Sequence, residues 1–125
     1  MTKSIVFKQV EEHKSKHDKT IKSLISRLNR HGDYDYIGNN IEYKFKGENN
    51  IIGEIDTYAA RKVNDTKYLL LFEVKTTDTP YGKAKAISQL RRSKETLKYL
   101  ADRIKTYYVY FDPFSKGFVH TEEIK

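Results

Sequence analysis

Apolar residues recur at helical spacing near the start of the chain. The stripe predicts an α-helix over residues 8–31 and consists of Val10, Ile21, Leu24, Ile25 and Leu28. Charged residues dominate between positions 11 and 20, so we expect the first turns to project into solvent. Gly32 follows the last periodic residues and is suited to end the helix.

Alternating apolar and polar positions come next, and they predict β-strands. The expected strands are residues 34–37, 41–46, 51–62 and 67–76, separated by turns at 38–40, 47–50 and 63–66. The last of these strands is the most apolar. Its continuous run from Tyr68 to Phe72 predicts a central strand that is covered on both faces.

The remaining residues predict a second helix and two further strands. A loop at 77–82 leads into a helix over 83–105, with a buried side made of Ile87, Leu90, Leu97, Leu100 and Ile104. Residues 106–112 predict a strand, and a turn at 115–117 leads to a short strand at 118–120. The order α-β-β-β-α-β with a β tail predicts one α/β domain over residues 1–125.

Composition narrows the class of protein. Charged residues make up 33% of the chain, and no apolar run approaches the roughly 20 residues that a membrane span needs. The N-terminus lacks the apolar stretch of a signal peptide. We therefore expect an intracellular protein, cytoplasmic or nucleoid-associated, with no membrane partner. The absence of cysteine excludes disulfides and thiolate metal sites.

The most informative pattern is GEID at residues 53–56, followed sixteen residues later by EVK at 73–75. Side chains alternate across a strand, so the two acids of GEID share a face, as do the acid and the lysine of EVK. The short turn at Asn64-Asp65 makes the two strands antiparallel neighbours. A turn centred there pairs positions whose numbers sum to 129, which places Asp56 opposite Glu73.

Adjacent carboxylates repel each other, and their burial is unfavourable without a cation. Mg²⁺ prefers carboxylate oxygens and can bind a substrate phosphate as well. Such an ion activates a bound water and offsets charge on a scissile phosphate. Lys75 would orient that water, help to deprotonate it or stabilise the transition state, and the sequence leaves these three roles open.

The alternative interpretation of the same residues is an ordinary salt bridge. Lys75 would then pair with Glu73 or Asp56 on a solvent-facing strand, as is common on exposed β-ribbons. We disfavour this interpretation because the charges interrupt the strand that the pattern predicts to be the most buried.

GEID followed by a strand ending in EVK resembles the PD-(D/E)XK nuclease superfamily, in particular archaeal Holliday-junction resolvases and small bacterial nuclease-like proteins that carry GEID. The resemblance covers residues 51–92 in motif and 8–112 in element order. It implies a restriction-endonuclease-like αβββαβ core with a mixed central sheet flanked by helices. It also implies phosphodiester hydrolysis with Mg²⁺ or Mn²⁺, with Asp56, Glu73 and Lys75 as the motif residues.

The resemblance assigns further residues. Many members place a glutamine on the following helix, and Gln89 fits that position. Glu54 matches the GEID group and would support the metal, while Ile55 replaces the familiar proline before the aspartate. Resolvase-like members also carry a glutamate on the first helix. Here that role would fall to one of three acids that are each more typical of a solvated surface: Glu11, Glu12 or Asp18.

Net charge is +7, which favours an anionic partner such as nucleic acid. The second helix carries eight basic residues: Lys83, Lys85, Arg91, Arg92, Lys94, Lys98, Arg103 and Lys105. The first helix adds Lys14, Lys16, Lys19 and Lys22. About half of these are expected only to solvate helix faces. For DNA binding the strongest candidates are Lys83, Lys85 and Arg92, with Arg91 as a further one, because the helix starts beside the acids.

Other residues suggest weaker hypotheses. The loop at 77–82 directly follows Lys75, and Tyr81 would stack on a base or sugar or else pack against the protein. His13 and His17 lie four apart, but the chain shows no HExxH motif and no third zinc ligand. No glycine-rich phosphate loop or nucleophile elbow is present.

Three functions remain open, and the first is favoured. It is a Mg²⁺- or Mn²⁺-dependent DNA endonuclease that is either structure-selective, for example for branched DNA, or relatively nonspecific, with Holliday-junction resolution as its most specific form. That form needs a homodimer, for which the aromatic segments 106–112 and 115–120 offer an interface. The second is a non-catalytic nucleic-acid binding module that retains the nuclease fold. The third is a protein-interaction domain whose basic surface meets acidic partners.

Overall fold

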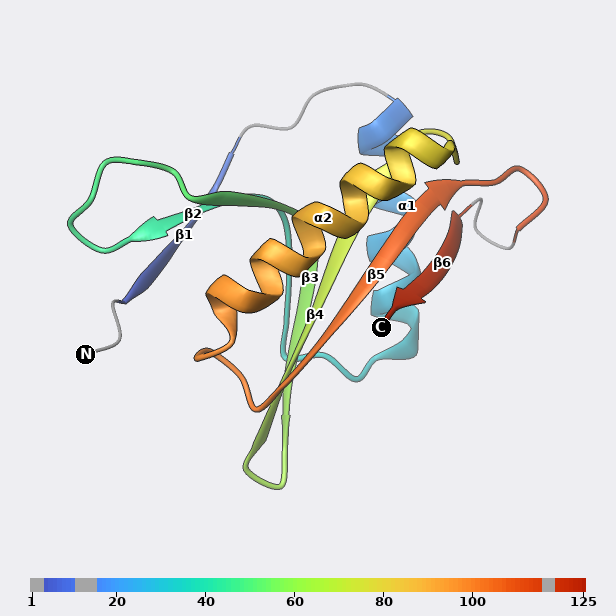
Figure 1. Cartoon of the computed structure of the whole chain (residues 1–125). Helices are drawn as coiled ribbons and strands as arrows, with labels where there is room; N and C mark the ends of the chain where they lie inside the picture. Colours follow the sequence, from blue (N-terminus) through green and yellow to red (C-terminus); the bar gives the residue numbers. More distant parts are fainter. Residues whose placement is uncertain (1–3, 11–15, 116–118) are drawn as a thin grey trace.

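The computed structural model of the chain describes residues 4–10, 16–115 and 119–125, with the side chains of 16–18 excepted. It is an α/β structure in which a six-stranded mixed sheet is flanked by two helices (Figure 1). The elements in chain order are β1 (Ile5–Gln9), α1 (Lys16–His31), β2 (Tyr36–Phe45), β3 (Gly53–Val63), β4 (Thr66–Lys75), α2 (Pro80–Leu97), β5 (Arg103–Phe111) and β6 (Val119–Ile124).

The strands lie in the sheet in the order of the chain, β1 to β6. All neighbours are antiparallel except β4 and β5, which are parallel and joined by α2. A parallel pair needs such a crossover because its strands run in the same direction. In the described part of the chain, no helix is long and apolar enough to cross a membrane.

The two helices cover opposite faces of the sheet. Successive residues of β4 show this, because Phe72 belongs to the core beneath α1 whereas Leu71 belongs to the core beneath α2. The α1 core contains Leu24 and the α2 core contains Leu90. The prediction that β4 is a central strand covered on both faces is confirmed.

The β3–β4 hairpin has the predicted register. Its pairs run from Val63–Thr66 to Thr57–Phe72, and the residue numbers of every pair sum to 129. Asn64 and Asp65 form the two-residue turn with φ angles of 49° and 68°. Positive φ at both central residues defines the type I′ turn, whose twist matches that of the strands. This turn therefore sets which residues of β3 and β4 face each other.

Replacing Asp65 with glycine is expected to raise the free energy of unfolding by about 0.5–1 kcal/mol, because glycine adopts positive φ without steric strain. The side chain of Asp65 is fully exposed, and its ion pair with Lys62 spans 3.7 Å, so little is lost with it. Urea unfolding would measure the change. Asp33→Gly, in an exposed segment before β2, is the control, and a destabilised Asp65→Gly protein would contradict this explanation of the turn.

The N-terminal prediction is wrong in part. Residues 5–9 form β1, an edge strand paired with β2, whereas the predicted helix began at residue 8. The structure shows helix α1 only from Lys16 onward. Pairing with β2 satisfies the backbone groups on one side of β1, and Val10 N–H donates to Asn40 O (2.7 Å), so this tertiary contact outweighs the local helical pattern.

The predicted turn at 38–40 is also wrong, because β2 continues through it. Asn40 has a φ of 52°, in the left-handed region that asparagine tolerates. Ile37 packs in the core beneath α1, whereas Tyr43 packs in the core beneath α2. Residues six apart would share a face in a regular strand. The backbone at Asn40 therefore shifts the alternation of side chains in β2, so that Tyr43 faces α2 although Ile37 faces α1. It does not reverse the direction of the chain.

Helix α2 begins and ends earlier than predicted. Thr79 caps it by accepting a hydrogen bond from Gly82 N–H (3.0 Å), and Pro80 occupies the first turn. The helix ends at Leu97, and Ile104 lies in β5, where it pairs with Leu69 of β4. Parallel pairing with the central strand outweighs the helical spacing that extended the prediction to residue 105. Strand β6 extends to Ile124, beyond residue 120 where the predicted strand ended.

Candidate active site

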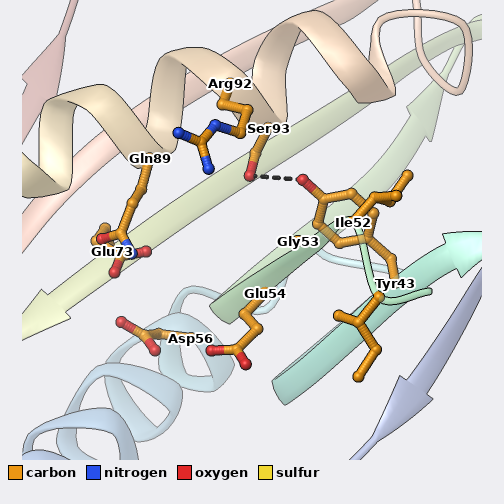
Figure 2. A pocket seen from close by; sticks show the side chains of 10 residues that line it. Tyr43, Ile52, Gly53, Glu54, Asp56, Glu73, Gln89, Arg92 and Ser93 are labelled. Atoms are coloured by element: carbon orange, nitrogen blue, oxygen red, sulfur yellow. Dashed lines mark hydrogen bonds between the residues drawn. The ribbon is translucent and has the colours of Figure 1, made fainter.

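A pocket of about 280 Å³ lies where β3, β4 and α2 meet. Figure 2 shows Asp56, Glu73 and Gln89 gathered at one end and Tyr43 and Ile52 at the other. The remaining lining residues are Ile51, Gly53 and Glu54 from the chain leading into and forming β3, and Arg92 and Ser93 from α2. The structure thus brings four predicted site residues, Glu54, Asp56, Glu73 and Gln89, to one cavity together with Arg92.

Asp56 lies where the backbone pairing of β3 is interrupted. Its chain neighbours Ile55 and Thr57 pair with β2, whereas the pairing with β4 ends at Thr57–Phe72. The Asp56 carboxylate accepts a hydrogen bond from Val74 N–H at 2.7 Å. A side chain therefore takes over a backbone hydrogen bond at this point, and it holds the carboxylate against β4.

Glu73 is buried beside that carboxylate and is only 9% exposed. Burial, together with the charges of Asp56 and Glu54 and a hydrogen bond to Asp56, raises the pKa of Glu73 from 4.5 to about 9, while Lys75 acts in the opposite direction. At neutral pH the Glu73 carboxyl therefore holds a proton in the absence of a cation. The Asp56 and Glu73 side chains lie on one side of the sheet, as the predicted register requires.

Lys75 lies next to the acid pair. Its Nζ is 3.9 Å from Glu73 Oε1, and its side chain is 27% exposed. This contact joins the two residues of the salt bridge in the alternative interpretation, but its setting differs from the one expected there. The Glu73 carboxyl that Lys75 faces is almost fully buried rather than on a solvent-facing ribbon, so exposed salt-bridging does not account for the arrangement.

Gln89 supplies an unused acceptor. Its Oε1 atom is buried and has no hydrogen-bond partner in the structure, although Gln89 lines the pocket from α2. Buried polar atoms without a partner are rare and require an explanation. One such explanation is that Gln89 Oε1 donates an electron pair to a cation at the acid end of the pocket.

The donors at the acid end fit Mg²⁺ or Mn²⁺. The buried Glu73 carboxyl, the half-buried Asp56 carboxylate and the buried amide oxygen of Gln89 are all oxygen donors. Mg²⁺ is commonly held by one or two carboxylates together with water and substrate phosphate. Among the described residues, no group of three or more Asp, Glu, His or Cys side chains is arranged to hold a metal. Glu54 lines the pocket without completing such a group.

Some predicted residues lie outside the described part of the chain. Glu11 and Glu12 belong to a segment that is not described, as does His13, and the side chains of His17 and Asp18 are not described either. The prediction of a first-helix acid therefore stays a prediction. The same holds for the two-histidine zinc hypothesis.

The predicted DNA-binding residues lie on different sides of α2. One face of α2 leads to the pocket and carries Tyr81, Lys85, Gln89 and Arg92. These residues follow one another at spacings of four, four and three, which places them on one side of a helix. Tyr81 is 80% exposed. Lys83 points elsewhere, because its Nζ contacts Glu122 of β6 at 2.9 Å. Arg91 is exposed but does not share the pocket face.

The residues at the opposite end of the pocket could not be predicted from the sequence. Tyr43 is fully buried, and its hydroxyl is 3.0 Å from Ser93 Oγ, which ties β2 to α2. A Cβ at Gly53 would clash with the Tyr43 hydroxyl, so glycine permits this close approach. Tyr43 lies in an alternating segment and Ser93 in a helix, and no local pattern in the sequence relates them.

Tyr43→Phe is expected to lower the free energy of unfolding by about 1–2 kcal/mol, because it leaves the buried Ser93 hydroxyl without a partner. Ser93→Ala on that background removes the second partner. The double variant is therefore expected to lose less than the sum of the two single variants. Urea unfolding of all four proteins measures this, and strict additivity would show that the two hydroxyls do not interact.

No family model matches the chain, and no curated protein matches it.

Proposed function

We propose that this protein is a Mg²⁺- or Mn²⁺-dependent DNA endonuclease with a restriction-endonuclease-like core. The stretch from α1 to β5 has the order α-β-β-β-α-β, which is the order that the resemblance to PD-(D/E)XK nucleases implies. Fold alone does not establish activity. The proposal therefore depends on the acid end of the pocket.

One observation carries the proposal. Asp56 and Glu73 line one pocket, where the Glu73 carboxyl is buried beside the Asp56 carboxylate. Burial first, and the charge of Asp56 second, raise the pKa of Glu73 to about 9. Keeping two carboxyls together and partly buried is unfavourable in a protein that needs them only for folding. A site that exists to bind a divalent cation explains why this arrangement is retained.

The residues have distinct proposed roles. Asp56 and Glu73 hold the ion, with the amide oxygen of Gln89 next to them and Glu54 adding negative charge to the pocket. When bound, the ion supplies Lewis-acid stabilisation of the phosphate and lowers the pKa of a bound water. Lys75, whose Nζ is 3.9 Å from Glu73 Oε1, would orient the attacking water, help to deprotonate it or stabilise the transition state.

Arg92 and Lys85 are proposed to contact the DNA phosphates. Both are exposed on the face of α2 that leads to the pocket. Each such contact releases counterions, so binding should weaken steeply with salt. Lys83 stays a weaker candidate because Glu122 neutralises it.

A cleavage panel tests the proposal. Linear, flapped and four-way branched DNA are incubated with Mg²⁺ or Mn²⁺ and the wild-type protein, Asp56→Ala or Glu73→Ala. Cleavage by the wild-type protein and its loss in both variants is the expected result. Glu95→Ala, an exposed acid of α2 that pairs with Lys98, is the matched control.

The same set of DNAs and proteins, with DNA binding measured alongside cleavage, separates the rival functions. DNA binding without cleavage, even with Mn²⁺, would indicate a non-catalytic nucleic-acid binding module. Cleavage that survives both alanine substitutions would refute the site. The absence of salt-dependent DNA binding would favour a protein-interaction domain.

Holliday-junction resolution is the narrowest form of the proposal. Symmetric cutting of two strands takes two active sites and hence a homodimer. Strand β6 is at an edge of the sheet next to the aromatic strand β5, and this edge is the proposed interface. Size-exclusion chromatography with light scattering should give about twice the chain mass of 14.7 kDa, and a strict monomer would exclude this form.

A further inference from the structure

The pocket extends well beyond the two acids. Its volume of about 280 Å³ is at the lower end of the roughly 300–1,000 Å³ that is typical of small-molecule sites. Gly53 and Asp56 both line it and lie three positions apart on β3, a span of roughly 10 Å at about 3.4 Å per residue. A group attached to a phosphate at the acid end can therefore reach the opposite end.

That opposite end is apolar and already ordered. Ile51 is 53% exposed on the lining, and the adjacent Ile52 N–H donates to Tyr43 O at 3.0 Å. The hydrogen bond between Tyr43 and Ser93 fixes the ring of Tyr43 (Figure 2). Because these groups are fixed before a ligand binds, little ordering is needed on binding.

Charge is unevenly distributed along the pocket. The carboxyl groups of Asp56 and Glu73 lie at one end, Glu54 lies between that end and Tyr43 (Figure 2), and Ile51 and Ile52 at the other end carry no charge. The exposed Arg92 lies on the α2 side of the lining and offers a donor fork for a phosphate. With the proposed cation at the acid end, the lining therefore suits a molecule with a phosphate there and a weakly polar body at the other end.

We infer that the Ile51–Tyr43 end of the pocket binds the base of an unpaired nucleotide next to the scissile phosphate. The inference rests on the proposed nuclease function and names its substrate class. A base inside a duplex is paired and stacked, and it enters a pocket only by leaving the helix, which is unfavourable except at unpaired positions. The pocket therefore selects nucleic acid with an unpaired nucleotide at the cleavage position over a fully paired duplex.

The test compares three DNA substrates of one sequence with Mg²⁺. The first is fully paired, the second has one unpaired thymidine, and the third has an abasic residue in place of that thymidine. The wild-type protein is expected to cut the second about 10-fold faster than the third, which is the size of effect that one bound base gives. The abasic substrate retains the distorted backbone, so the comparison isolates the base.

Ile51→Ser is the informative variant, since an exposed side chain tolerates the change. It is expected to remove most of the 10-fold difference between thymidine and abasic substrates. Val63→Ser, at the other end of β3 and 41% exposed, is the matched control and should keep the difference. Equilibrium binding of the same DNA to Asp56→Asn, followed by fluorescence anisotropy, gives a readout without cleavage and should show the same preference.

The outcomes distinguish the two proposals. Equal cutting of the thymidine and abasic substrates, with cleavage still dependent on Asp56 and Glu73, would overturn the base pocket and leave the nuclease proposal standing. A preference that Ile51→Ser and Val63→Ser both retain would also overturn it. If no substrate is cut and Asp56→Asn binds all three equally, both proposals fail.

Discussion

Glu73→Gln is expected to abolish DNA cleavage while making the protein more stable above neutral pH. The amide cannot supply a charged ligand, and the loss of a transition-state interaction of this kind typically slows catalysis by about 10³-fold. Glutamine is nevertheless close to glutamic acid in shape and can donate a hydrogen bond to Asp56, as the protonated carboxyl does. Loss of activity with a gain in stability identifies a residue that is retained for function.

The stability gain follows from linkage. The pKa of Glu73 is raised from 4.5 to about 9 in the folded protein, so folding requires proton uptake between these pH values. The contribution of Glu73 to stability is therefore fully present below pH 4.5 and is lost as the pH rises toward about 9. Glutamine does not titrate, so we expect Glu73→Gln to exceed the wild-type free energy of unfolding by roughly 2–4 kcal/mol near pH 8.

Urea unfolding at several pH values, without divalent cations, measures this difference. It should vanish near pH 4, where glutamic acid is protonated in both states. Glu95→Gln, with an exposed side chain, should show no such trend. A Glu73→Gln protein that is as stable as the wild type at pH 8, or less stable, would contradict the raised pKa of Glu73 and the unfavourable burial of its carboxyl beside Asp56.

Mg²⁺ binding is expected to tighten strongly as the pH rises. Metal ligands must be deprotonated, and the raised pKa of Glu73 means that the ion must displace a proton below about pH 9. The apparent affinity should then rise by about 10-fold per pH unit, or about 100-fold over two units.

Isothermal titration calorimetry in two buffers of different ionisation enthalpy measures both quantities. About one proton per bound ion is expected to be released near pH 7.5. Asp56→Asn, which retains an acceptor for the Val74 N–H, should bind the ion much more weakly. An affinity that is independent of pH, with no proton release, would show that Glu73 is not a ligand.

The core of the site could be predicted from the sequence because its geometry is local. A two-residue turn at Asn64-Asp65 fixes the register of β3 and β4, and strand alternation then fixes which side chains share a face. Asp56 and Glu73 share a face for these two reasons, and a hydrogen bond from Val74 N–H then holds the Asp56 carboxylate against β4 beyond the last backbone pair. Gln89 was expected only from the resemblance to PD-(D/E)XK nucleases, and α2, which crosses from β4 to β5, brings it to the pocket.

Other features could not be predicted, because distant contacts decide them. Residues 5–9 form strand β1 because they pair with β2. Ile104 fits a helical pattern but lies in β5, where it pairs with Leu69 of β4. The left-handed Asn40 shifts the alternation of side chains in β2, so that Tyr43 reaches Ser93. Fifty positions separate Tyr43 and Ser93, and local periodicity carries no information about such a contact. The apolar end of the pocket was missed for this reason.

The central claim is that Asp56 and Glu73 together bind one divalent cation, and Mn²⁺ binding followed by electron paramagnetic resonance tests it most directly. At pH 8 the wild-type protein should remove about one Mn²⁺ per chain from the free-ion signal, whereas Asp56→Asn and Glu73→Gln should remove far less. Glu95→Gln should behave as the wild type. Equal Mn²⁺ binding by all four proteins, or none by the wild type, would contradict the claim.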